Sequence, residues 1–269
     1  MNTLQGKIAL VTGASRGIGR AIAQRFAAEG ATVVITARSL NTATVEGTLS
    51  ETARLIEAAG GRAIALAADL ENPAERDALV ERAVAAAGGL DILVNNAGFA
   101  EYAPVAEMPG DMFERTVDHY LRAPFALIQR AVPHLRQRGA GWILNIGSVT
   151  AEPPQRPFDD FARFGGATVY AAVKAAMHRF TEGVAAELQI DNIAVNLVGP
   201  SGAIRTPGAA RYIPADYPTE PVEYLVETAL ALCHKPAAEL TGEVTYSMAY
   251  PAAHNLIVYQ LDGRTPLAQ

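Results

Sequence analysis

Short apolar runs alternate with helical patterns along almost the whole sequence, and no other feature limits the possible folds as much. Residues 7–12 and 32–37 are short and rich in β-branched side chains, and residues 18–29 between them carry apolar side chains at helical spacing. By the same criteria we predict further strands at residues 63–68, 90–95, 142–147, 193–198 and 243–247. Further helices are predicted at residues 48–59, 73–87, 170–188 and 221–234, with two helical segments in 111–138. The helix at 48–59 opens with the capping-box pattern Thr48–Glu51.

Apolar strands separated by helices require a parallel sheet that is covered on both faces, and right-handed crossovers make such a sheet doubly wound. A length of 269 residues suits one domain with one sheet, and no repeat or long linker divides the chain. We therefore predict a single α/β domain over residues 1–269 with a Rossmann-type doubly wound sheet. Two polar, proline-rich segments, a loop insert at about 152–167 and a substrate loop at about 206–220, are expected to lie over the site.

The charge balance argues against polyanionic partners. The chain has 22 Lys and Arg against 28 Asp and Glu, a net charge of −6, and no run of basic residues. Nucleic acid or an anionic membrane surface would need a positive field that this chain does not offer. The sequence therefore predicts neither nucleic-acid binding nor a membrane association.

The cysteine and histidine content predicts a reducing compartment and no metal site. Cys233 is the single cysteine, so no internal disulfide can form. No apolar segment reaches 18 residues, and the first residues do not resemble a signal peptide, so we predict a cytoplasmic protein. The histidines share no ligand spacing and are interpreted as surface or half-buried side chains: His119, His134, His178, His234 and His254.

The first predicted strand runs directly into a glycine-rich turn, T-G-A-S-R-G-I-G at residues 12–19, and then into a helix. In a doubly wound sheet this is the place where a dinucleotide binds, because glycines let the backbone approach the pyrophosphate and helix N–H groups point at it. The spacing is G-x-x-x-G-x-G rather than the commoner G-x-G-x-x-G. We predict cofactor contacts from the following residues of the turn: Gly13, Ser15, Arg16, Gly17, Ile18 and Gly19.

The residues after the second strand favour NADP(H). A site for NAD would offer an acidic residue to the ribose 2′-hydroxyl at this point, whereas this chain has Arg38 there and Arg16 in the turn. Two guanidinium groups suit a 2′-phosphate of about −1.5 to −2 charges. The alternative interpretations are two solvated surface arginines, or a site for NAD.

Together, these motifs resemble those of the short-chain dehydrogenase/reductase family, and the similarity extends from the N-terminus to about Gly242. It rests on the glycine turn, Asp69 after the third strand, the segment N-N-A-G at residues 95–98, Ser148 after the fifth strand, and the pair Tyr170 and Lys174. The resemblance implies catalysis by Ser148, Tyr170 and Lys174. It also implies cofactor contacts from Asp69, Leu70, Asn96, Ala97, Gly98, Tyr170, Lys174, Pro200, Ile204 and Thr206, and a homodimer or homotetramer formed through the helices up to and including that of Tyr170.

The chemistry of the three candidate catalytic residues is consistent with this resemblance. Tyr170 and Lys174 are four positions apart in a helical pattern, so they share one face. Lowering the pKa of a phenol by about 3 units takes roughly 4 kcal/mol, which a neighbouring ammonium and a nicotinamide cation could supply. Ser148 could donate a hydrogen bond to the substrate oxygen as charge develops on it. We predict an NADPH-dependent oxidoreductase that transfers a hydride between the nicotinamide and a ketone or secondary alcohol, with Tyr170 as general acid/base.

The sequence departs from the family pattern at several places. Tyr120 stands where the family usually has an asparagine that helps to hold a water beside the lysine, which puts a complete proton relay in doubt. The segment at residues 199–202 is one residue longer than the usual Pro-Gly, and the C-terminal strand lacks the common Asp-Gly-Gly ending. Two alternatives therefore stay open: an NAD-dependent dehydrogenase of the same fold, and a nucleotide-binding regulatory protein with impaired catalysis.

The segment between Ser148 and Tyr170 is unusually long, because these residues are 22 positions apart. Residues 157–164, P-F-D-D-F-A-R-F, predict a short helix with Pro157 in its first turn and glycines at its end. Three phenylalanines, Phe158, Phe161 and Phe164, would then gather toward one side. We expect a lid whose rings face the pocket and select an apolar ketone; the alternative is packing of the rings onto the protein's own surface or a subunit interface.

Overall fold

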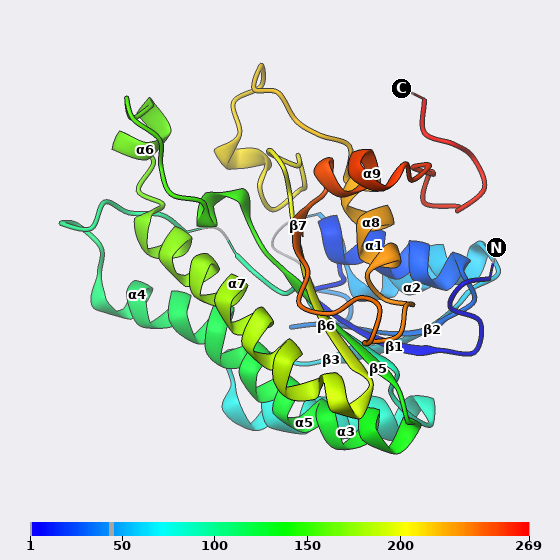
Figure 1. Cartoon of the computed structure of the whole chain (residues 1–269). Helices are drawn as coiled ribbons and strands as arrows, with labels where there is room; N and C mark the ends of the chain where they lie inside the picture. Colours follow the sequence, from blue (N-terminus) through cyan, green and yellow to red (C-terminus); the bar gives the residue numbers. More distant parts are fainter. Residues whose placement is uncertain (1, 43–45, 100, 269) are drawn as a thin grey trace.

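A seven-stranded parallel sheet forms the centre of the computed structural model, which describes residues 2–42, 46–99 and 101–268 (Figure 1). The strands of the described chain are β1 (Ile8–Thr12), β2 (Thr32–Ala37), β3 (Arg62–Ala67), β4 (Ile92–Asn95), β5 (Gly141–Ile146), β6 (Ile193–Gly199) and β7 (Val244–Tyr246). Their order in the sheet is β3-β2-β1-β4-β5-β6-β7, and every neighbouring pair is parallel. The predicted doubly wound parallel sheet is confirmed, and each predicted strand is present within two residues of its predicted ends.

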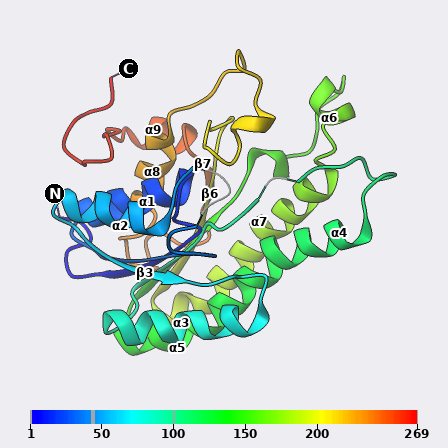
Figure 2. The same cartoon turned by 180° about the vertical axis from the view of Figure 1, so that it is seen from behind.

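Helices cover both faces of this sheet. They are α1 (Gly17–Ala28), α2 (Leu49–Ala58), α3 (Pro73–Ala87), α4 (Gly110–Val117), α5 (Ala123–Arg138), α6 (Asp160–Phe164), α7 (Thr168–Leu188), α8 (Val222–Ala231) and α9 (Ala249–His254). In both views α1, α2 and α8 lie on one side of the sheet, and α3, α5 and α7 lie on the other (Figures 1 and 2). The buried apolar residues form two clusters accordingly, one under each helical layer.

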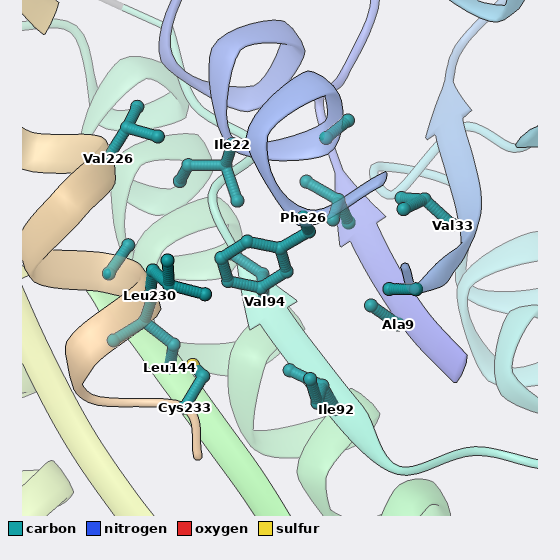
Figure 3. Close-up of a cluster of buried hydrophobic side chains, with 14 of the residues drawn as sticks. Ala9, Ile22, Phe26, Val33, Ile92, Val94, Leu144, Val226, Leu230 and Cys233 are labelled. Atoms are coloured by element: carbon teal, nitrogen blue, oxygen red, sulfur yellow. The ribbon is translucent and has the colours of Figure 1, made fainter. Parts of the chain in front are cut away.

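The larger cluster is built around Phe26 of α1. Its ring is fully buried and lies among Ile22 of the same helix, Val94 of β4 and Leu230 of α8 (Figure 3). Burying such a side chain contributes about 1.5–3 kcal/mol. The near-continuous apolar strands are therefore explained by burial from both sides.

Local signals fix several helix ends. Asn72 caps α3, because its Oδ1 accepts a hydrogen bond from the Ala74 N–H at 3.0 Å and Pro73 follows at the first helical position. Thr48 caps α2 by accepting from the Glu51 N–H at 3.1 Å. Only this half of the predicted capping box forms, because the Glu51 carboxylate instead pairs with Arg20 at 3.0 Å.

The helix between β4 and β5 widens into one π-helical turn, Asp118–Arg122, which joins α4 to α5. Pro124 explains its position, because proline has no N–H to donate to the carbonyl four residues earlier, that of Tyr120. The Ala123 N–H accordingly bonds to the Asp118 carbonyl, five residues back. Within this turn the rings of the consecutive residues His119 and Tyr120 meet edge-on, with their centroids 5.6 Å apart.

The insert forms a short helix, as predicted, but its bounds and its surroundings differ from the prediction. Helix α6 begins at Asp160 rather than at Pro157, because the Asp159 side chain accepts from the Ala162 N–H at 2.7 Å. It projects from the body of the molecule in both views (Figures 1 and 2). The three rings are exposed, with 39% of Phe158, 55% of Phe161 and 75% of Phe164 accessible to solvent. The expectation that they face a pocket is therefore wrong for this conformation, since so short a helix has no neighbouring layer to pack against.

Candidate active site

The glycine turn lies after β1, beside the junction with β4 where the strand order reverses. Gly13 and Gly17 have φ of +66° and +56°, a region that favours glycine. A Cβ on Gly13 would come within 2.7 Å of the Ala97 Cα, and one on Gly19 within 2.5 Å of the Gly13 carbonyl oxygen. Side chains are therefore excluded at these two glycines, where the turn packs closely on itself and on the segment after β4.

Hydrogen bonds join this turn to the segment after β4. The Thr12 hydroxyl donates to the Val94 carbonyl at 3.1 Å and accepts from the N–H groups of Asn96 and Ala97, each at 3.0 Å. The Asn96 side chain donates to the Thr12 carbonyl at 2.7 Å. The structure thus brings together two of the predicted cofactor-binding segments.

The loop after β6 reaches the same place. The Thr206 Cβ lies 3.0 Å from where a Cβ of Gly17 would be, so Thr206 is packed against the glycine turn. Ile204 is buried nearby in the core cluster under α1 and α8. At the start of the loop, the Ser201 N–H donates to the Ser247 hydroxyl at 2.8 Å, and that hydroxyl donates to buried Glu220 at 2.7 Å. These bonds fix the loop that begins at Pro200.

Two arginines converge at the far end of the turn. Arg16 is half-buried, while Arg38 is exposed just after β2. Burial lowers the pKa of Arg16, and the positive charges of Arg38 and Arg20 lower it further. The charge of Arg20 is neutralised by Glu51, which lies 3.0 Å away. Arg16 and Arg38 repel each other, and their charges make this end of the turn electropositive.

Asp69 and Leu70 lie after β3, at the same edge of the sheet. The Asp69 carboxylate accepts from the Glu71 N–H at 3.0 Å, and the Leu70 side chain is buried. The buried Arg76 donates to the Leu70 carbonyl at 3.2 Å and so holds this turn against α3. These positions agree with the place that the sequence predicts for them.

The three candidate catalytic residues also meet. Ser148 follows β5, and Tyr170 and Lys174 lie one turn apart on α7. The Lys174 Nζ lies 5.7 Å from the centre of the Tyr170 ring and donates to the Ile146 carbonyl at 2.7 Å. The Ser148 hydroxyl bonds with that of Thr150 at 2.8 Å and also with the phenol of Tyr170.

Burial dominates the protonation of this cluster. It lowers the pKa of Lys174 to about 7. It also raises the pKa of Tyr170, and the neighbouring Tyr102 raises it further, whereas the bond from Ser148 lowers it. The pKa of this phenol is therefore raised rather than lowered in the protein alone, because desolvation outweighs the hydrogen bond from Ser148.

Two tyrosines enclose Tyr170, and the sequence interpretation had assigned a site role to neither. The Tyr120 ring meets that of Tyr170 edge-on with centroids 5.2 Å apart, and the Lys174 Nζ lies 4.4 Å from its centre. The Tyr120 hydroxyl is fixed by the Phe99 backbone, whose N–H donates to it at 2.8 Å and whose carbonyl accepts from it. Tyr102, in the segment before α4, packs on Tyr170 with centroids 5.4 Å apart. No motif marks these contacts, because they join segments that are distant in the sequence.

Metal-binding clusters and membrane-spanning helices are both absent from the described residues. In residues 2–42, 46–99 and 101–268, no cluster of three or more His, Cys, Asp or Glu side chains could hold a metal ion. Within the same residues, the helices are too short or too polar to pass through a lipid bilayer.

Comparison with known proteins agrees with this geometry. The family model described as short chain dehydrogenase matches residues 7–216. The chain is 39% identical over 205 residues to 3beta-hydroxysteroid dehydrogenase 1 of Eggerthella lenta, covering 76% of this chain and 73% of that protein.

Solved structures show the same fold. Hydroxysteroid dehydrogenase from Escherichia coli superposes with a TM-score of 0.76 at 31% identity, covering 91% of this chain and 97% of the other. L-Sorbose reductase from Gluconobacter frateurii, solved in complex with NADPH and L-sorbose, gives the same TM-score, identity and coverage.

Proposed function

This chain belongs to the short-chain dehydrogenase/reductase family and is an oxidoreductase of alcohol or carbonyl groups, and we propose that it reduces an apolar ketone with NADPH. The observation that carries the proposal is the assembly of Ser148, Tyr170 and Lys174 beside the glycine turn. A protein that only bound a nucleotide would have no need of these three side chains.

The residues of the site fit a nicotinamide dinucleotide. The turn at residues 13–19 carries no side chain at Gly13, Gly17 and Gly19 and leads into the N-terminus of α1, whose N–H groups would bind a pyrophosphate. Asp69 and Leu70 would hold the adenine, and Asn96 to Gly98 with Lys174 would hold the ribose and the nicotinamide, together with Pro200, Ile204 and Thr206. When bound, the nicotinamide supplies or accepts the hydride.

The protein's own side chains supply the proton that the substrate oxygen receives. Ser148 donates a hydrogen bond to the substrate oxygen, and Tyr170 gives its phenolic proton to that oxygen as negative charge develops there. Lys174, with its pKa lowered to about 7, can hold or release a proton near neutral pH and so recharge Tyr170. Tyr102 and Tyr120 exclude water from the phenol by packing on its ring.

The proposed substrate class rests on the names of two similar proteins. One relative and one solved structure are named hydroxysteroid dehydrogenases, whose substrates carry the reacting oxygen on an apolar ring system. Phe158, Phe161 and Phe164 are exposed on the projecting insert, and they would add apolar surface to the site only if the insert closed over it. We also propose a cytoplasmic location, because a chain with the single cysteine Cys233 forms no internal disulfide and suits a reducing compartment.

A substrate panel tests the proposal. The purified protein is assayed for NADPH consumption with cyclic apolar ketones, short aliphatic ketones, 3-oxoacyl thioesters and quinones. Faster turnover of cyclic ketones supports the proposal. Consumption of NADH only would favour an NAD-dependent enzyme, and tight cofactor binding without turnover of any carbonyl would favour a regulatory protein.

The preference for NADP(H) has its own test. If Arg16 and Arg38 hold the 2′-phosphate, Arg38→Asp is expected to weaken NADPH binding by about 10-fold or more and NADH binding much less. Titration calorimetry with both cofactors measures this, and Arg179→Asp on the exposed side of α7 is the control with the same change in charge. An unchanged ratio of the two affinities would contradict the assignment of Arg38.

A further inference from the structure

A small cavity lies directly behind the candidate catalytic lysine. Its volume is about 10 Å³, enough for one water molecule, and its lining includes Lys174, Tyr120, His119 and Asn95. A second space of the same size shares His119 and Asn95 with the first and extends to Thr12. His119 and Asn95 therefore border both spaces.

Several polar side-chain atoms around these spaces lack hydrogen-bond partners among the described residues. Among the described residues, the Asn95 Oδ1 and both ring nitrogens of His119 are buried and accept or donate no hydrogen bond. The Asn95 amide N–H₂ already donates to the Asn145 side chain at 2.9 Å, and Lys174 donates to the Ile146 carbonyl at 2.7 Å. Buried polar groups without a partner are costly, so a cavity of this size lined by them is suited to an ordered water.

The charge state of His119 is set by its surroundings. Its side chain is 11% exposed, which agrees with the expectation of a half-buried histidine. Burial lowers its pKa to about 4. The charge of Glu71 opposes this shift, the charges of Arg115 and Lys174 lower the pKa further, and Asp118 has the smallest effect, which raises it. The ring is therefore neutral near pH 7, and a neutral imidazole has one nitrogen that donates and one that accepts.

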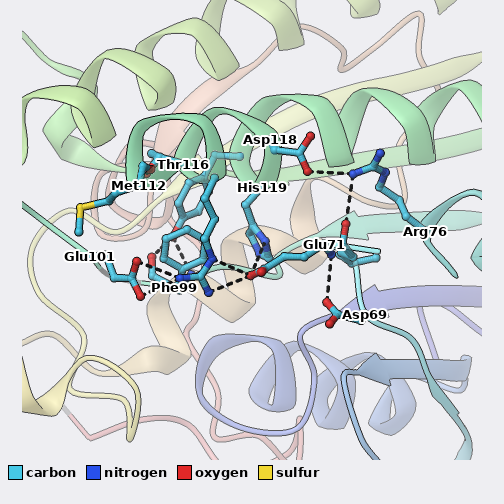
Figure 4. A network of polar contacts seen from close by, with 12 residues as sticks. Asp69, Glu71, Arg76, Phe99, Glu101, Met112, Thr116, Asp118 and His119 are labelled. Atoms are coloured by element: carbon cyan, nitrogen blue, oxygen red, sulfur yellow. Dashed lines mark hydrogen bonds and ion pairs between the residues drawn. The ribbon is translucent and has the colours of Figure 1, made fainter. Parts of the chain in front are cut away.

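On its outer side, His119 faces a cluster of charges that reaches solvent. The Nδ1 lies 3.9 Å from the Glu71 Oε1, and we therefore assign Nε2 to the cavity that the ring lines. Arg115 holds Glu71 and Glu101, each at 2.9 Å, and these three side chains are about one-third exposed (Figure 4). The imidazole itself is held by the edge-on Phe99 ring at 4.9 Å.

We propose that His119, through a water in this cavity, carries protons between Lys174 and the solvent at Glu71. The inference rests on the proposed function. As Tyr170 gives its proton to the substrate oxygen, Lys174 transfers one N–H proton to the phenolate, and the water transfers one O–H proton to the Lys174 amine. His119 gives the proton on Nε2 to the resulting hydroxide while its Nδ1 takes the O–H proton of the Glu71 carboxyl group, which has first taken that proton from solvent. One proton crosses from solvent to substrate, no electrons move, and His119 ends as the other neutral tautomer, which rotation or exchange restores. It acts through Lys174 and does not touch the reacting atoms.

Kinetics in H₂O and D₂O test the relay. His119→Phe keeps a ring against Phe99 but removes both nitrogens, and we expect kcat to fall about 10-fold with a larger solvent isotope effect and a steeper dependence on pH. His119→Gln, which can hold the water but cannot exchange protons as an imidazole does, is expected to behave in the same way even if His119→Phe folds poorly. His134→Phe, which removes a histidine bonded to Glu81 far from the site, is the control. Unchanged kcat and isotope effect in His119→Phe, or full activity in His119→Gln, would overturn the relay.

A second measurement does not depend on turnover. In ¹⁵N-histidine spectra of the wild type, we expect the His119 ring to contact a long-lived water and to change its nitrogen shifts in Lys174→Met. Absence of that contact refutes the water bridge even in an active enzyme. A wild type that shows the contact but reduces no carbonyl refutes the proposed function, not the bridge.

Discussion

Tyr170 lies at the centre of the candidate site, where it contacts Ser148, Tyr102 and Tyr120. Because it is proposed to supply the proton, Tyr170→Phe is expected to lower kcat by roughly 10²-fold or more while NADPH affinity stays nearly the same. Steady-state kinetics and calorimetry measure the two quantities. Tyr224→Phe on α8 is the matched control, and equal turnover in Tyr170→Phe would exclude this residue as the acid.

Ser148→Ala is expected to lower kcat as well, through the loss of one donor to the substrate oxygen.

Lys174 links the site to the stability of the fold. Burial lowers its pKa from the usual 10.5 to about 7, so between these pH values the unfolded chain carries a proton that the folded protein lacks. The free energy of unfolding therefore rises with pH in this window. We expect wild type to gain stability relative to Lys174→Met between about pH 7.5 and about pH 9.5.

Urea unfolding of both proteins at several pH values checks this expectation. Burial raises the pKa of Cys233 and Tyr170, which lowers stability at alkaline pH, but both proteins contain these groups. The difference between the two curves therefore reports on Lys174. Curves that stay parallel across the window would mean that Lys174 keeps its ordinary pKa in the folded protein.

At the scale of elements, α6 is the part of the chain with the least packing. Its three exposed rings contribute little to stability in this conformation, so replacing Phe158 and Phe161 by serine should change the free energy of unfolding by less than about 0.5 kcal/mol. If the insert closes over bound substrate, the same double variant should raise KM about 10-fold for large apolar ketones and much less for small ones.

Matched kinetics with one large and one small ketone separate the alternatives for α6. Arg163→Ser, on the same helix, is the control for loss of surface contacts. An equal effect on both ketones would contradict a lid, and a loss of thermal stability alone would indicate a structural role of the rings.

At the scale of the whole molecule, α4 and α5 present exposed aromatic side chains. Phe113 on α4 is 50% exposed, and Phe125 on α5 is 48% exposed and pairs with Phe180 of α7 at 6.4 Å between centroids. The resemblance to the family implies a closed homo-oligomer through these helices. We expect sedimentation velocity to show a dimer or tetramer at micromolar concentration, and Phe125→Glu to shift it toward monomer. Phe164→Glu, on the projecting α6, should leave it unchanged; a monomeric wild type would contradict the expectation.

Most of the fold could be predicted because its signals are local. The alternation of apolar runs with helical patterns, the cap at Asn72 and the glycine turn each act within a few residues, and together they predicted the parallel sheet and the segments that meet at its edge. The meeting of Ser148 with Tyr170 and Lys174 was implied by the resemblance to the family, whereas the four-residue spacing of Tyr170 and Lys174 predicted their common helix face. In those cases the sequence pattern and the physical cause cover the same short stretch of chain.

Tertiary structure decided the properties that depend on burial. The π-helical turn before Pro124 brings His119 and Tyr120 to one site, although adjacent residues of an ordinary helix point in different directions. Desolvation then lowers the pKa of Lys174 and raises that of Tyr170, and no local pattern carries that information. The α6 rings are the converse case, because their helical spacing indicated a common face but could not show whether any surface lies opposite it. Which atoms are removed from water is determined by residues far apart in the chain, so it could be read only from the folded molecule.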